Sequence, residues 1–170
     1  MSGNVIIRSE TESDTEAISE VTEAAFETLA VSNHTEQFIV HALRRANALV
    51  VSLVAEADGK VVGHIAFSPV IISDGSADWY GLGPISVLPE LQRQGIGKAL
   101  MREGLSALGR LGAKGCVLVG DPDYYRRFGF TNPPDLTVEG VPPQYLLVLP
   151  FDDNEASGTV AFHEGFKANG

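Results

Sequence analysis

The sequence predicts a mixed α/β fold, with one mostly antiparallel central sheet flanked by helices. In the middle of the chain, three segments rich in β-branched residues follow one another across short turns, which is typical of an antiparallel meander. Further on, a helical segment lies between two apolar strand segments. Such a crossover implies one parallel strand pair within the sheet.

The first elements are a strand and two helices. Residues 5–7 form a short apolar strand, and Ser13 with Glu16 makes a capping-box pattern in front of the first helix. Thr35 is expected to cap the second helix. The apolar faces of the two helices follow helical spacing: Ile18, Val21, Ala25 and Leu29 on the first, and Phe38, Ala42 and Leu43 on the second.

The meander comes next. Residues 49–57 and 61–72 are joined by Asp58-Gly59, a strong hairpin signal because a tight primed turn needs residues that tolerate positive φ. Asp74-Gly75 supplies a second turn before a strand from about Trp79 to Val87.

A helix is predicted after Pro89, followed by the remaining strands. Cys116–Val119 is short enough for a buried strand, and Asp121-Pro122 resembles an N-cap followed by proline at the first helical position. Gly129 is expected to end a short helix over 124–128. The apolar stripe of the helix after Pro89 consists of Ile96, Leu100, Gly104, Ala107 and Leu111. The last two strands are expected at residues 144–149 and 159–162.

Length and composition indicate one domain over residues 1–170, with 44% hydrophobic and 20% charged residues. The net charge of −10 disfavours nucleic acid and anionic membranes as partners. A lone cysteine and the absence of a signal-peptide pattern favour the cytoplasm. The oligomeric state stays open, with a homodimer as one alternative.

Chemistry is concentrated in the segment from Gly83 to Leu100, where a strand runs into a glycine-containing turn that opens a helix. Unpaired backbone N–H groups and the helix dipole favour an anion at such a turn. Gly95 and Gly97 carry no side chain that would block a close approach. The turn is therefore predicted to bind a pyrophosphate.

Three phosphate-binding patterns compete for this turn. A P-loop would need glycine at Gln92 and serine or threonine at Ala99. The dinucleotide pattern G-x-G-x-x-G has Leu100 in place of its last glycine. It also follows predicted antiparallel strands, whereas a Rossmann unit requires parallel ones, so this pattern fails as well. Residues 92–97, Gln-Arg-Gln-Gly-Ile-Gly, match Q/R-x-x-G-x-G/A, which resembles the acetyl-CoA signature of the GNAT superfamily of N-acetyltransferases.

Three further motifs carry the same resemblance in register along nearly the whole chain. Residues 85–89 are similar to the strand before the GNAT signature, residues 58–63 to the hairpin between the second and third strands, and residues 125–130 to the Y-x-x-x-G-F helix. Residues 120–125 resemble the YhbS-like subgroup of predicted N-acetyltransferases. The resemblance implies the GNAT fold and an enzyme that passes the acetyl group of acetyl-CoA to an amine.

The resemblance also implies a set of cofactor-binding residues. In GNAT folds the pantetheine arm lies in a slot between two splayed strands, so Gly83 and Pro84 are interpreted as a bulge that opens this slot; an edge strand or simple bulge is the alternative. The expected acetyl-CoA contacts are Ile85, Ser86, Val87, Gln92, Arg93, Gln94, Gly95, Ile96, Gly97 and Lys98, with Tyr124 and Phe128 packed beside the cofactor.

Tyr125 is the candidate general acid, because the family's tyrosine at this motif position donates a proton to the departing thiolate. The alternative is a packing role. The glutamate that many GNAT enzymes carry at or near Gly83 is missing, and no general base is assigned among the remaining candidates, which are Glu23, Glu27, Asp78 and His64.

Cys116 lies in an apolar run and is expected in the core, and the four histidines show no metal-ligand spacing, so no metal is expected. Direct attack of the amine in a ternary complex then fits better than a covalent intermediate. A non-catalytic acyl-CoA sensor, supported by the missing glutamate, stays open, and a nucleotide-binding module is disfavoured.

Overall fold

The computed structural model describes residues 4–27, 29, 32 and 34–169. Its strands are β1 (Val5–Ser9), β2 (Val51–Ala57), β3 (Lys60–Ile72), β4 (Trp79–Val87), β5 (Gly115–Val119), β6 (Leu136–Thr137), β7 (Leu146–Pro150) and β8 (Gly158–Phe162). Its α-helices are α1 (Thr15–Glu27), α2 (Glu36–Arg45), α3 (Ile96–Arg110) and α4 (Pro122–Tyr125). Short 3₁₀ turns include Arg126–Phe128 after α4 and Glu164–Lys167 near the C-terminal end.

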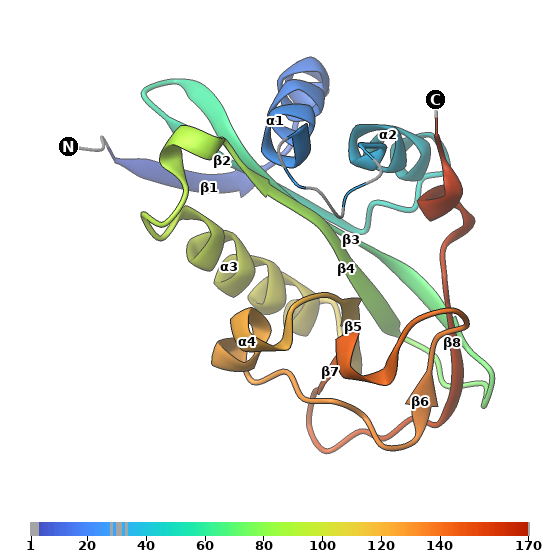
Figure 1. Cartoon of the computed structure of the whole chain (residues 1–170). Coiled ribbons are helices and arrows are strands. Elements are labelled where there is room, and N and C mark those ends of the chain that lie inside the picture. Colours follow the sequence, from blue (N-terminus) through green and yellow to red (C-terminus); the bar gives the residue numbers. More distant parts are fainter. Residues whose placement is uncertain (1–3, 28, 30–31, 33, 170) are drawn as a thin grey trace.

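The sheet has the predicted mixed topology (Figure 1). Strands β1 to β4 form an antiparallel meander, β4 pairs with β5 in parallel, and β5 pairs with β7 antiparallel. The hairpin turn between β2 and β3 is confirmed, since Asp58 and Gly59 both have positive φ, 52° and 78°. The far end of β3 also pairs with β8.

A short parallel pairing of β6 with β8 was not predicted from the sequence. Strand β6 has only two residues, too few for a period-2 pattern to appear. The start of β7 also differs from the prediction, because residues 143–145 form a 3₁₀ turn and the strand begins at Leu146.

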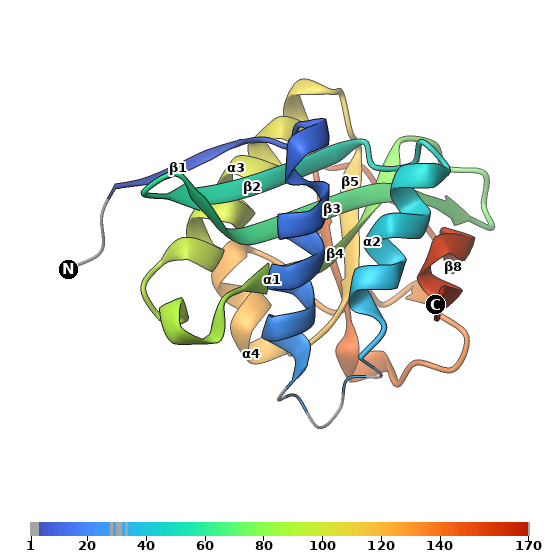
Figure 2. The ribbon, with the colours of Figure 1, turned by 90° about the horizontal axis from the view of Figure 1, so that it is seen from above.

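Helices cover both faces of the sheet (Figure 2). Helices α1 and α2 lie on one face, where Ile18, Val21 and Val40 pack against Val54 and Val61 of the sheet. Helix α3 lies on the other face and buries its Leu100, Met101 and Leu108 side chains completely. No helix within the described part of the chain is long and apolar enough to cross a membrane.

Helix α3 approaches the sheet closely at one glycine. A Cβ atom on Gly104 would lie 2.4 Å from the ring of Phe67, which is itself fully buried on β3. Glycine at this position lets the helix settle against the aromatic ring. The predicted stripe of α3 is correct at Ile96, Leu100 and Gly104, but Leu111 lies beyond the helix and is exposed.

Two predictions about the first helix were wrong. The capping box is formed by Thr11 and Asp14, not by Ser13 and Glu16: the Thr11 N–H donates to Asp14 Oδ2 at 2.7 Å. Helix α1 ends at Glu27, so Leu29 lies outside it and is exposed.

In α2, Thr35 is the N-cap, and its carbonyl accepts from the N–H groups of Phe38 and Ile39. Phe38 is exposed, and the buried residues are Val40 and Leu43.

Candidate active site

The candidate site lies where β4 and β5 separate. Their parallel pairing covers residues 79–81 of β4 and 115–117 of β5. Beyond it, β4 carries the predicted bulge at Gly83 and Pro84, since Ile85 and Leu82 lie opposite Ile65 and Phe67 of β3. The bulge adds one residue to β4 and bends it away. The predicted splayed pair is confirmed.

A cavity of about 590 Å³ opens beside the separated part of β4. Its walls come from three places: the end of β4, the turn that opens α3, and the face of α4 and the turn after it. A volume of this size suits a ligand of cofactor dimensions. The lining residues are Ile85, Ser86, Val87, Leu91, Gln92, Arg93, Gly95, Gly97, Lys98, Tyr124 and Arg127.

The turn at the start of α3 has the geometry of an anion site. Gly95 is the N-cap in the left-handed region, with φ of 88°, and Gln92 is tied to β4 because its Nε2 donates to the Val87 carbonyl at 3.1 Å. The first N–H groups of α3 lack helical acceptors, and the helix dipole adds positive charge there.

Cationic side chains gather around the same cavity. Arg93, Lys98 and Arg127 line it, although the chain as a whole has a net charge of −10. Arg127 also stacks on Tyr124, with its Cζ 4.8 Å from the ring centroid. The local excess of positive charge therefore favours a ligand with several negative charges.

The structure brings most of the predicted cofactor residues to this cavity, but not all. Gln94 is exposed, and Ile96 is buried in the core beneath the turn. Phe128 lies in a neighbouring hollow with Lys98, Arg102 and Arg127. Ile96 can therefore contact a ligand in the cavity through its backbone but not through its side chain.

Leu91 and Arg127 are wall residues that sequence reasoning missed. Arg127 follows Tyr124 by three residues, so one turn of helix places both on the same side. That spacing was the signal that would have found Arg127.

The two neighbouring tyrosines have different surroundings. Tyr124 lines the cavity, and its hydroxyl lies 3.1 Å from where a Cβ on Gly97 would be. Tyr125 packs against Gly120 and Phe130, and burial raises the pKa of its phenol to about 12. The Tyr125 hydroxyl therefore keeps its proton throughout the neutral range.

The acidic base candidates from the sequence lie away from this cavity. Glu23 and Glu27 are exposed on α1, and Asp78 is exposed just before the first residue of β4, whereas the cavity lies at the other end of that strand. Among the described residues that line the cavity, none is acidic. Within the same described residues, no group of three or more histidine, cysteine, aspartate or glutamate side chains is arranged to hold a metal ion.

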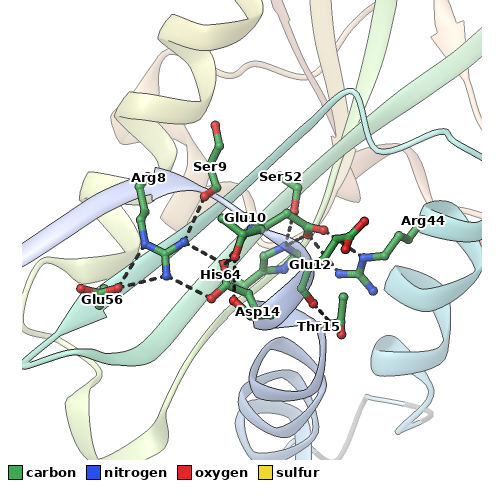
Figure 3. Close-up of polar contacts among 12 residues, drawn as sticks. Arg8, Ser9, Glu10, Glu12, Asp14, Thr15, Arg44, Ser52, Glu56 and His64 are labelled. Atoms are coloured by element: carbon green, nitrogen blue, oxygen red, sulfur yellow. Dashed lines mark hydrogen bonds and ion pairs between the residues drawn. The ribbon is translucent and has the colours of Figure 1, made fainter.

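His64, itself fully buried, belongs to a partly buried polar network between the sheet and the first two helices (Figure 3). Its Nε2 lies 2.8 Å from Ser52 Oγ, whose hydroxyl donates to Glu10. Because that hydroxyl proton is already committed, His64 must donate from Nε2. Arg44 Nε donates to the same Glu10 carboxylate at 2.9 Å. These contacts support a structural role for His64.

The network should make stability depend on pH. Burial lowers the pKa of His64 to about 4, while an unfolded histidine titrates near ~6.5. Between these values the unfolded chain binds the extra proton, so the free energy of unfolding should decrease as pH falls, by roughly 1–3 kcal/mol from pH 7 to pH 4. Denaturant titrations at several pH values measure this slope.

His64→Gln provides the matched comparison, because glutamine keeps a side-chain donor but does not titrate. The variant should start less stable and lose less stability on acidification than the parent. Equal slopes for the two proteins would assign the pH dependence to groups other than His64.

Cys116 is fully buried on β5, and burial raises its thiol pKa. A protonated, inaccessible thiol is a poor nucleophile, so the predicted core position is confirmed.

Two splayed parallel strands, with a glycine-containing helix start at their open end, are the arrangement of the GNAT fold. Residues 49–132 match the family model described as an acetyltransferase (GNAT) domain. The chain is also 34% identical over 169 residues to YhbS of Escherichia coli K12, named an uncharacterized N-acetyltransferase, covering 95% of this chain and 98% of that protein. The chain belongs to the GNAT acetyltransferase family.

Solved structures agree with this assignment. A GNAT family acetyltransferase from Brucella melitensis, crystallised with acetyl-CoA, is 51% identical, with a TM-score of 0.86 and coverage of 96% of this chain and 98% of the other. YhbS from Escherichia coli in complex with CoA is 33% identical, with a TM-score of 0.89 and coverage of 100% and 96%.

Proposed function

We propose that this protein is an acetyl-CoA-dependent N-acetyltransferase that acts as a single domain and transfers the acetyl group directly to an amine. The observation that carries the proposal is the cavity at the open end of the β4–β5 pair, with its anion-binding turn and its cationic rim. The Brucella relative, 51% identical, was crystallised with acetyl-CoA. We also propose that the protein acts in the cytoplasm, as its lone cysteine led us to expect.

In this proposal the turn holds the pyrophosphate. The N–H groups after Gly95 donate to its oxygens, while Lys98 and Arg127 neutralise its charge. Ile85, Ser86 and Val87 line the cavity along the stretch of β4 that does not pair with β5, so the backbone there is placed to bond to the pantetheine amides. The thioester then lies near the bulge, between the two strands.

The chemical step joins the amine nitrogen to the thioester carbon. The C–N bond forms, the C–S bond breaks, and the electron pair leaves on sulfur as CoA thiolate. Tyr125 is proposed to donate its phenol proton to this sulfur. The attacking nitrogen loses one N–H proton as the amide forms, and this proton restores the phenol through solvent. Tyr125 is suited to the role because its proton is retained at neutral pH.

A non-catalytic acyl-CoA sensor is the second candidate, since the cofactor cavity has no acidic residue among its described lining. Incubation with acetyl-CoA and a panel of amines separates the two functions. An enzyme should release free CoA and form acetylated amine in equal amounts. Binding of acetyl-CoA without CoA release from any amine would favour the sensor.

A further inference from the structure

A second cavity, of about 240 Å³, lies against β4 at the bulge. Its walls include Leu82, Gly83 and Pro84, directly preceding the three β4 residues that line the cofactor cavity. Val119, at the end of β5, also lines this cavity. The two cavities therefore adjoin consecutive stretches of one strand, beside the gap where the thioester is proposed to lie.

The rest of this second cavity is apolar except at one point. Phe26 of α1, Ile39 of α2, and the aromatic pair Phe162 and Phe166 complete its walls. The rings of that pair lie 5.4 Å apart. Among the described residues that line the cavity, Glu36 alone carries a charge.

Glu36 is the first residue of α2, and its carboxylate is held in place by a neighbouring serine. Ser32 Oγ lies 2.8 Å and 2.7 Å from the two Glu36 oxygens and accepts the N–H of His34 at 2.9 Å. The single hydroxyl proton of Ser32 therefore points to Glu36. One such donor leaves the carboxylate with free acceptor sites for a second partner.

A single carboxylate in an apolar pocket selects a cation with an apolar body, because the charge needs a partner and the walls need apolar surface. The volume lies below the range of roughly 300–1,000 Å³ usual for drug-sized ligands. We propose that this cavity binds the acceptor, a small primary amine with an aromatic or aliphatic body, and that Glu36 binds its ammonium group and removes the proton. This inference rests on the proposed acetyltransferase function.

The proton balance is complete with these groups. The amine enters as an ammonium ion, Glu36 takes one proton, and the freed lone pair forms the C–N bond. The nitrogen loses a second proton as the amide forms, and this proton replaces the one that Tyr125 gave to the leaving sulfur. Glu36 then releases its proton to solvent, so each turnover yields acetylated amine, CoA thiol and one proton.

The acceptor class is tested with benzylamine and ethanolamine at equal concentrations. Benzylamine should have the larger kcat/KM, by about 10–100-fold, because its ring is buried on binding. Preference for ethanolamine, or turnover of neither amine, would overturn the apolar acceptor. Preference for the peptide Phe-Gly-Gly over benzylamine would overturn the proposed small amine and indicate a peptide N-terminus as the acceptor.

The role of Glu36 is tested with Glu36→Gln, using benzylamine, which is cationic at pH 7, and aniline, which is neutral. The kcat/KM for benzylamine should fall by about 10²–10⁴-fold, the usual contribution of a positioned base, and that for aniline far less. Glu23→Gln, at an exposed position on α1, is the matched control and should change neither.

Equal losses with both amines, or no loss with benzylamine, would remove Glu36 from the reaction. The thermal shift caused by acetyl-CoA is measured on each variant and should persist in all of them. A missing shift in the parent protein would instead contradict the proposed function itself, so the two failures are distinguishable.

Discussion

Tyr125→Phe should lower turnover by about 10²–10⁴-fold while leaving the affinity for acetyl-CoA nearly unchanged. Phenylalanine keeps the ring, which packs against Gly120 and Phe130, and removes only the hydroxyl. If that hydroxyl protonates the leaving thiolate, its loss raises the barrier to C–S cleavage and does not alter binding. Steady-state kinetics with one identified acceptor, together with calorimetric titration of acetyl-CoA, measures both quantities.

Tyr124→Phe is the matched control. Tyr124 uses its ring, which lies 5.6 Å from that of Phe128 and under the guanidinium of Arg127. Its substitution should therefore reduce turnover much less. Equal and small losses at both positions would return Tyr125 to a packing role, and a larger loss at Tyr124 would mean that the other tyrosine is the acid.

Gly97→Val should weaken acetyl-CoA binding by roughly 10–100-fold, the range expected when hydrogen bonds to a charged group are lost. A Cβ at this position already lies 3.1 Å from the Tyr124 hydroxyl, and the branched side chain would occupy the approach to the first N–H groups of α3. Calorimetric titration of acetyl-CoA gives the two dissociation constants.

Gly109→Val is the control, because Gly109 lies on the same helix and an added Cβ there meets nothing within 4 Å. The control carries the same penalty in helix propensity. Its affinity should equal that of the parent. An unchanged dissociation constant in Gly97→Val would move the pyrophosphate away from this turn.

Much of the fold follows from patterns that are local in the sequence. The β-branched segments predict the meander, and Asp58-Gly59 predicts its first turn because both residues take positive φ. Pro84 in a strand predicts the bulge, since proline removes a ladder donor. Gly95 before α3 and Gly97 in its first turn led to the prediction of an anion site, which stays a prediction. Each of these signals acts within a few residues.

The misses depend on contacts between different elements of the fold, which the residue pattern of one element does not contain. Ser13 and Glu16 satisfy the capping pattern, but Arg8 of β1 pairs with Asp14 at 2.7 Å, and the box forms there instead. Glu36 resembles any acid in the first turn of a helix. Only the packing of α2 beside the bulge of β4 brings it to a cavity wall.

Titration of the protein with acetyl-CoA, followed through the thermal midpoint of unfolding, tests the central claim most directly. Binding to the folded state adds about 2.7 kcal/mol of stability at ~100 times the dissociation constant. For a chain of this size that corresponds to a rise of roughly 5–10 °C, increasing with ligand concentration. A midpoint that stays unchanged across a wide range of acetyl-CoA concentrations would contradict the account.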